Sequence, residues 1–257
     1  MKKFENVMLA SDIDGTFLWE GGYIHPRNIE MVRYFCENGG HFAFSSGRNY
    51  KDVYRLIPGL RELVNMPCIL CNGSFLYDVE TETILNPSYI DPCVTDLFQK
   101  VRDKFPNVRM RVCDTAGAEI DISPTEKDDR MLDLDAEKIF KGVFVSDEAT
   151  LAHIAAFIEE TYPNTFSLTK PKDILMDMQP LGIAKNSQFA YLHGLYPNAK
   201  LWCVGDYNND LEMLRAADVA ACPANASDEV KAISSVHLCH CKDGAIAELI
   251  EKIEETL

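Results

Sequence analysis

Short apolar runs alternate with amphipathic helical patterns in this 257-residue sequence, and this alternation limits its possible folds more than any other feature. Apolar runs occupy residues 7–11, 41–46 and 67–71, and helical periodicity covers 26–38 and 49–56 between them. Strands that read as continuous apolar runs are buried on both faces, as in parallel sheets. The first part of the chain therefore predicts an α/β fold in which helices cover both faces of a parallel sheet.

The rhythm changes after about residue 80. The segments 108–114 and 118–123 alternate between apolar and polar residues, which is typical of a sheet that packs on one face only. Further strands are expected at 138–146, 164–170 and 173–180, with helices at 91–105 and near 147–161. We interpret this block as a separate α+β domain inserted into the first fold.

The alternation of apolar runs and helical patterns returns near residue 183. Helices are expected at 183–194, 208–217 and 243–255, and strands at 200–204 and 218–221. The expected organisation is therefore a discontinuous core, formed by residues 1–83 and 179–257, with an α+β domain inserted at 84–178.

The chain is strongly acidic, with a net charge of −15 and an isoelectric point near 4.8. Such a field repels nucleic acids and anionic membranes, so neither is an expected partner, and no obligate protein partner is evident. It also repels phosphorylated molecules, so a phosphate site has to be made cationic locally. The first apolar run ends at Asp12, too short for a signal peptide, and no run approaches the length of a membrane span. We therefore expect a soluble cytoplasmic protein.

Nine cysteines include a C-x-x-C at Cys68 and Cys71 and a C-x-C at Cys239 and Cys241, so a zinc site has to be considered. Residues 68–71 read as the interior of a strand, which sends neighbouring side chains to opposite faces. Zinc knuckles need a turn between their cysteines. Reduced, buried thiols are the preferred interpretation.

Chemically reactive side chains follow four of the expected strands or open the helices after them. The stretches are "SDIDGTF" at 11–17, "SSGRN" at 45–49, "GIAKNSQ" at 182–188 and "GDYNND" at 205–210. Each fragment alone has an ordinary explanation, as a turn, a solvated lysine or an acidic helix start. In an open parallel sheet, however, the carboxyl ends of the strands form the ligand-binding edge. We expect one crevice to contain Asp12, Asp14, Ser46, Lys185, Asp206 and Asp210.

Two of these acids suit a reaction at phosphorus. The carboxylate of Asp12 can attack phosphorus as a nucleophile, and Asp14, among like charges, has reason to hold a proton and act as the general acid and base. Mg²⁺ prefers carboxylates and phosphate oxygens, and it would reduce the repulsion between Asp12 and an anionic substrate. The expected ligands are Asp12 and Asp206, the main-chain carbonyl of Asp14, and Asp210 directly or through water.

Phosphate-binding groups are expected around these acids. The hydroxyl of Ser46 and the N–H of Gly47 can donate hydrogen bonds to phosphoryl oxygens, and Lys185 adds a positive charge. Arg48 and Asn209 are expected at the same rim, where they would position the substrate.

These residues resemble the haloacid dehalogenase superfamily of phosphatases, in particular its Cof-type branch with a large α/β cap. "DIDGT", "SSGR", Lys185 and "GDYNND" match its four motifs in order, and "CNGSFLYD" and "KDGAIAELI" are similar to its flanking segments. The resemblance implies a doubly wound Rossmann-like core, Mg²⁺ dependence and hydrolysis of phosphomonoesters through an aspartyl-phosphate. It makes Asp12 the nucleophile, Asp14 the acid and base, Ser46 and Lys185 the phosphate binders, and Asp206, supported by Asp210, the metal ligand.

The chain departs from the branch at three places. Asn186 stands where the branch usually has glycine, and Ser46 stands where threonine is commoner but keeps the hydroxyl. "CPANA" (222–226) replaces a loop that usually contains glycine. A small sugar phosphate is the family-level expectation for the substrate, and phosphorylated cofactors such as pyridoxal phosphate are the second choice. A phosphomutase remains the alternative enzyme, and a non-catalytic sensor or a receiver domain fits less well, because Asp12 and Asp14 are both present at this spacing. The charged run Lys127, Asp128, Asp129 and Arg130 either faces the crevice or, as we prefer, is solvated.

Overall fold

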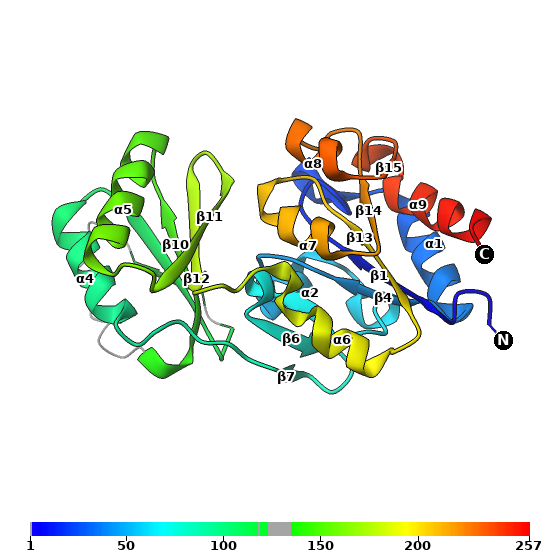
Figure 1. Ribbon diagram of the computed structural model, residues 1–257, viewed down its shortest axis with the longest axis horizontal. Coiled ribbons are helices and arrows are strands. Elements are labelled where there is room, and N and C mark those ends of the chain that lie inside the picture. Colours follow the sequence, from blue (N-terminus) through cyan, green and yellow to red (C-terminus); the bar gives the residue numbers. More distant parts are fainter. Residues whose placement is uncertain (1, 118, 123–134) are drawn as a thin grey trace. The chain divides into compact units, whose positions relative to one another are not determined.

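The computed structural model describes residues 2–117, 119–122 and 135–257 (Figure 1). The chain divides into two compact units, a core unit of Met1–Asn86 with Ala184–Leu257 and a second unit of Pro87–Ile183. Both boundaries lie a few residues beyond those expected from the sequence, because Thr83–Leu85 still pairs with a core strand and Leu175–Pro180 pairs within the second unit. The charged run at 127–130 lies outside the described residues.

Five parallel strands form the central sheet of the core unit, in the order β15-β14-β13-β1-β4. Their bounds are Val7–Ser11 (β1), His41–Phe44 (β4), Lys200–Val204 (β13), Val219–Cys222 (β14) and Val236–His237 (β15). All five residues of β1 are buried, as its continuous apolar sequence predicts. The parallel sheet expected from the sequence is confirmed.

Helices flank this sheet. Figure 1 shows α1 and α9 side by side on one face and α7 on the other. Helix α1 begins at Pro26, whose fixed φ suits a first helical turn. The helices of the core unit are Pro26–Glu37 (α1), Tyr50–Leu56 (α2), Leu60–Leu63 (α3), Phe189–Leu195 (α6), Leu211–Ala216 (α7), Asp228–Ile233 (α8) and Ala245–Glu255 (α9). The segments expected as helices from 183 and 208 start instead with tight 3₁₀ turns, Lys185–Gln188 and Asn208–Asp210.

The third apolar run does not join the central parallel sheet as expected. It forms β5 (Cys68–Leu70), which meets the chain just after β4 through an isolated parallel bridge between Ser45 and Ile69. Its other partner is antiparallel, in a small sheet with β6 (Phe75–Asp78) and β7 (Thr83–Leu85). The reversal is made by the turn Cys71–Gly73, in which all three residues have positive φ. A short hairpin, β2 (Leu18–Trp19) with β3 (Tyr23–Ile24), follows β1 and was not expected.

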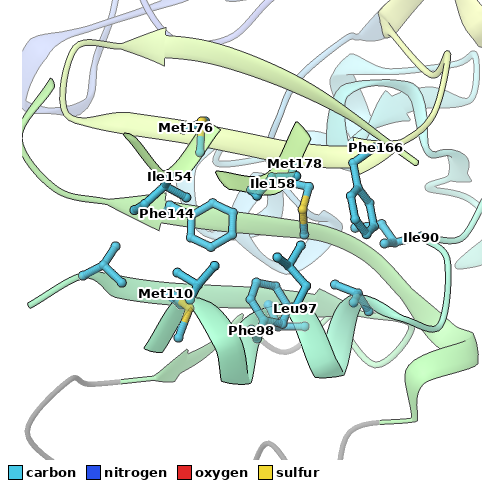
Figure 2. Close-up of a cluster of buried hydrophobic side chains, with 14 of the residues drawn as sticks. Ile90, Leu97, Phe98, Met110, Phe144, Ile154, Ile158, Phe166, Met176 and Met178 are labelled. Atoms are coloured by element: carbon cyan, nitrogen blue, oxygen red, sulfur yellow. The ribbon is translucent and has the colours of Figure 1, made fainter. Parts of the chain in front are cut away.

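The second unit is an antiparallel sheet with two helices, which confirms the inserted α+β architecture. The sheet has the order β11-β12-β10-β8-β9, and its elements are Arg109–Asp114 (β8), Glu119–Ile122 (β9), Ile139–Val145 (β10), Phe166–Lys172 (β11) and Leu175–Pro180 (β12), with helices Val94–Lys104 (α4) and Glu148–Thr161 (α5). Figure 2 shows side chains from the sheet and both helices gathered in one buried cluster. Met176 and Met178 belong to it, whereas Asp177 between them pairs with Lys141.

Each of the nine cysteines is present as a reduced thiol. Cys71 lies just beyond the end of β5 rather than inside it, because the strand stops at Leu70. Within the described part of the chain, no helix combines the length and the apolar character needed to cross a membrane.

Candidate active site

Three neighbouring strands of the core sheet end at the same level. Ser11, the last residue of β1, pairs with Phe44 at the end of β4 and with Val204 at the end of β13. Asp12, Ser46 and Asp206 follow these strand ends by one or two residues. The register of the sheet therefore brings three stretches together that are far apart in sequence.

Lys185 joins this edge of the sheet from the turn Lys185–Gln188. Its side chain is completely buried, and its Nζ lies 2.6 Å from Oδ1 of Asp12 and 2.5 Å from Oδ1 of Asp210. Burial alone lowers the pKa of a lysine, but the two carboxylates raise the pKa of Lys185 above its ordinary value. The ammonium is therefore a permanent positive charge between two acids.

Both oxygens of Asp210 are used by protein donors. Oδ1 accepts a hydrogen bond from Lys185, and Oδ2 accepts the backbone N–H groups of Asp206 at 3.0 Å and Tyr207 at 3.2 Å. A Cβ at Gly205 would lie 2.5 Å from the carboxyl carbon of Asp210, so this side chain needs a glycine behind it. Asp210 thus fixes the loop that carries Asp206 and holds the lysine in place.

Asp206 faces the turn after β1. Thr16 donates a hydrogen bond from its hydroxyl to Oδ1 of Asp206 at 3.3 Å, and Gly15, with φ of +82°, lies against the same carboxylate. Burial raises the pKa of Asp206 to about 7, and the neighbouring charge of Asp210 adds to this effect. Burial likewise raises the pKa of Asp12 well above its ordinary value, although Lys185 opposes the shift.

The donor set fits a divalent cation. One carboxylate oxygen from each of Asp12, Asp206 and Asp210 lies within 4.8 Å of the others. Among the ion pairs of the described residues, Lys185 is the one cation that pairs with these acids, and it pairs with Asp12 and Asp210. If all three are ionised, two negative charges remain for a bound cation to balance, and carboxylate oxygen is a preferred ligand of Mg²⁺.

Asp14 lies apart from this group and faces a different cation. Its carboxylate accepts two hydrogen bonds from Arg48, Nε to Oδ2 at 2.6 Å and Nη2 to Oδ1 at 2.7 Å. The sequence predicts like charges around Asp14, whereas the structure places the guanidinium of Arg48 against its carboxylate. Asp14 also enters an isolated bridge with Leu18, at the start of the unexpected β2–β3 hairpin.

The loop after β4 contains Ser46 and Gly47, which the sequence predicts as phosphate-binding groups. Ser46 is buried, and its Oγ accepts the N–H of Arg48 at 3.3 Å, so the hydroxyl keeps its own hydrogen to donate. A Cβ at Gly47 would lie 2.8 Å from Oδ1 of Asn72, so a larger residue there would require the side chain of Asn72 to move. Asn209, expected at the rim, lies in the turn Asn208–Asp210 just before Asp210.

Sequence reasoning missed three side chains that support these loops. Thr16 reaches Asp206, Asn72 lies against Gly47, and Asn225 donates from Nδ2 to the carbonyl oxygen of Gly15 at 2.7 Å. Thr16 and Asn72 lie inside stretches already singled out, "DIDGT" and "CNGS". Asn225 lies in "CPANA", and its partner is 210 residues away, so no local pattern connects the two.

A family model described as haloacid dehalogenase-like hydrolase matches residues 9–250. The chain belongs to this family. This haloacid dehalogenase-like hydrolase superposes on a HAD/COF-like hydrolase from Plasmodium vivax with a TM-score of 0.80 and 19% identity, covering 98% of this chain and 97% of the other. The fold of the Cof-type branch expected from the motifs is thereby confirmed.

Curated relatives agree with this family. The hydrolase C215.10 of Schizosaccharomyces pombe is 24% identical over 96% of this chain and 90% of its own length. Pyridoxal phosphate phosphatase YbhA of Escherichia coli is 31% identical over 78 residues, which are 30% of this chain and only 28% of that enzyme. By its family this chain is therefore a hydrolase, and the Escherichia coli relative with a more specific name is a phosphatase.

Proposed function

We propose that the chain is a Mg²⁺-dependent phosphatase that hydrolyses a small phosphorylated metabolite through an aspartyl-phosphate on Asp12. The observation that carries the proposal is the buried Asp12 carboxylate at the end of β1, held by Lys185 beside Asp206 and Asp210. A carboxylate fixed in this way is an oriented nucleophile, and Lys185 offsets part of its repulsion from a phosphate.

In the first step, a carboxylate oxygen of Asp12 attacks phosphorus, and the bond from phosphorus to the leaving oxygen breaks. Asp14 in its acid form gives its proton to that oxygen. The hydroxyl of Ser46, the N–H of Gly47 and the ammonium of Lys185 hold the transferring phosphoryl oxygens, and Arg48 and Asn209 position the rest of the substrate.

In the second step, a water molecule attacks the aspartyl-phosphate. Asp14, now a carboxylate, takes the proton of the water, and the bond between phosphorus and Asp12 breaks to release inorganic phosphate. Mg²⁺, held by Asp12 and Asp206 with Asp210 as their support, would supply the positive charge that the ionised site lacks.

For the substrate class we draw on the family and on one named relative. The Escherichia coli relative is named for pyridoxal phosphate, and the match covers less than a third of each chain. We place a sugar phosphate first and pyridoxal phosphate second. A phosphomutase of the same fold would pass the phosphoryl group to a second hydroxyl of the substrate instead of to water.

A screen of sugar phosphates, pyridoxal phosphate and p-nitrophenyl phosphate with Mg²⁺ tests the proposal by inorganic phosphate release. Asp12→Ala should be inactive. Asp218→Ala serves as the matched control, because Asp218 hydrogen-bonds the backbone of Leu201 near the opposite end of β13. Activity retained in Asp12→Ala, or a phosphoryl group trapped on another residue, would overturn the mechanism. Phosphoryl transfer between hydroxyls without phosphate release would identify a phosphomutase.

A further inference from the structure

Gln188 is a buried glutamine that the proposed chemistry does not use. It ends the turn that begins at Lys185, and only 1% of its surface is exposed. Its Nε2 donates to the carbonyl oxygens of Gly73 at 2.7 Å and Asn86 at 3.3 Å, and its Oε1 accepts a hydrogen bond from Nδ2 of Asn86 at 2.8 Å. A buried amide is costly to leave unpaired, so these three bonds select one position for the side chain.

The partners of Gln188 lie at the places where the chain leaves and re-enters the core unit. Asn86 is the last core residue before the chain enters the second unit, and Ala184 is the first core residue after its return. Asn86 has a φ of +47°, in the left-handed region that asparagine tolerates better than most residues. Gly73 lies so close to the returning chain that a Cβ there would be 2.0 Å from the carbonyl oxygen of Ala184. The segment that leaves the core unit at Asn86 and the segment that returns at Ala184 therefore both lie close to Gln188.

The same short turn carries Lys185. Residues three apart in a 3₁₀ turn are eclipsed, so Lys185 and Gln188 lie on one side of it. Ser187 ties the turn to its start, since its N–H donates to the carbonyl oxygen of Ala184 at 2.9 Å and its hydroxyl accepts the N–H of Ala184 at 3.0 Å. A turn braced in this way moves as a unit, and a displacement at Asn86 would shift the ammonium between Asp12 and Asp210.

We infer that Gln188 is a positioning residue, which fixes the position of Lys185 by hydrogen-bonding its turn to Asn86 and Gly73. The inference rests on the proposed function where it assigns phosphate binding to Lys185. It makes the conformation of the chain at Asn86 part of what sets the affinity for phosphate.

The test uses Asn86→Gly, Gln188→Leu and the double variant in the full chain. Asn86→Gly keeps a residue that adopts positive φ but removes the amide that meets Gln188. Asn164→Gly is the matched control, because Asn164 also has a positive φ, of +52°, but belongs to the second unit. The measurements are KM and kcat for p-nitrophenyl phosphate, the inhibition constant of inorganic phosphate, and hydrogen exchange of the Ser187 amide.

Each single variant should raise both KM and the inhibition constant. We expect about three- to tenfold for Asn86→Gly, which removes one hydrogen bond, and at least as much for Gln188→Leu, which removes three. The double variant should be no worse than the poorer single variant, since both break the same anchor. Exchange at Ser187 should accelerate in Asn86→Gly and stay unchanged in Asn164→Gly. A fall in kcat alone, with KM and the inhibition constant unchanged, would reflect lost active protein and would overturn the inference, as would additive effects.

The exchange measurement does not depend on activity. If the wild-type protein hydrolyses no phosphomonoester, the proposed function fails, and faster Ser187 exchange in Asn86→Gly would still support the anchor. If the protein is an active phosphatase but the Ser187 amide exchanges at the same rate in Asn86→Gly as in the wild type, the inference about Gln188 fails and the proposed function stands.

Discussion

Arg48 donates hydrogen bonds to both carboxylate oxygens of Asp14, from Nε to Oδ2 at 2.6 Å and from Nη2 to Oδ1 at 2.7 Å. The guanidinium is planar, so two parallel hydrogen bonds fix the plane of the carboxylate as well as its position. Both side chains are about one-third exposed or more, at 33% for Arg48 and 40% for Asp14. A pair so open to water contributes little to stability, and its value lies in orientation.

Replacing Arg48 with lysine should therefore impair catalysis more than folding. Lysine keeps the charge but has a single donor group and cannot hold both oxygens in one plane. We expect kcat/KM to fall by about tenfold on alkyl phosphates, whose poor leaving group needs an oriented acid, and by less on p-nitrophenyl phosphate. Arg33→Lys, in an exposed pair with Glu62, is the control. Equal losses on both substrates would show that Arg48 does not orient Asp14.

Asp14→Asn should keep the fold and most of the metal affinity while slowing turnover. The amide still accepts from Arg48 but cannot transfer a proton, and general acid–base catalysis contributes roughly 10²–10⁴-fold. A leaving-group series measures the effect, since kcat/KM should become steeply dependent on the acidity of the alcohol. A variant with near wild-type rates on alkyl phosphates would remove Asp14 from the proton-transfer step.

Removal of the metal should abolish activity and lower stability together. EDTA leaves three neighbouring carboxylates with one close ammonium, which pairs with Asp12 and Asp210. A cation that binds only the folded state stabilises it by mass action. The melting temperature should rise with Mg²⁺ concentration, and Asp206→Asn should weaken that rise. A melting curve indifferent to Mg²⁺ would argue against a resident cation at these acids.

The metal-free protein should lose stability as the pH rises from about 4 to 7. Burial raises the pKa of Asp206 from an ordinary 3.8 to about 7, so the folded chain holds a proton that the unfolded chain has released in this window. The free energy of unfolding then falls with pH, by up to about 1.4 kcal/mol per pH unit for one such group. Asp12, whose pKa is also raised, adds to the slope.

Urea unfolding in EDTA at several pH values measures this slope. Asp206→Asn should flatten it, because the amide has no proton to release, and saturating Mg²⁺ should flatten it in the wild-type protein. The expected origin would be wrong if the slope were the same in Asp206→Asn and wild type.

Lys185→Met should be inactive and strongly destabilised. It removes the ammonium from two buried carboxylates, Asp12 and Asp210, and breaking a buried pair in this way costs about 3–5 kcal/mol. Lys252→Met breaks an exposed pair with Glu248 on α9 and should change the free energy of unfolding by less than about 1 kcal/mol. Similar losses in the two variants would show that the buried triad has no special role in stability.

The core sheet was predictable because each of its main strands carries its own signal. The apolar run of β1 and the residues of β13 match the expected ranges without adjustment, 7–11 and 200–204. The period-two segments of the second unit likewise form β8 and β9, which pair with each other. These patterns record burial on one or two faces, and burial is a property of each segment by itself.

The details of the candidate site were less predictable, because they depend on which distant segments meet. The pairing of Arg48 with Asp14 is absent from any local pattern, since the two residues belong to loops after different strands. The departure of β5 from the sheet depends on the backbone of Cys71 and Asn72, two non-glycine residues with positive φ. The 3₁₀ turn of Lys185 forms among tertiary contacts that helical periodicity does not record.

The turn after β1 has a consequence for how such an enzyme could evolve. A Cβ at Gly15 would lie 2.2 Å from Oδ2 of Asp206, and the φ of +82° is itself unfavourable for other residues. Two segments separated by most of the chain thus meet with no space left for even one methyl group. Position 15 therefore has to remain glycine. Variation that changes the substrate has to occur elsewhere, at side chains whose growth or loss does not push Asp206 away from Asp12.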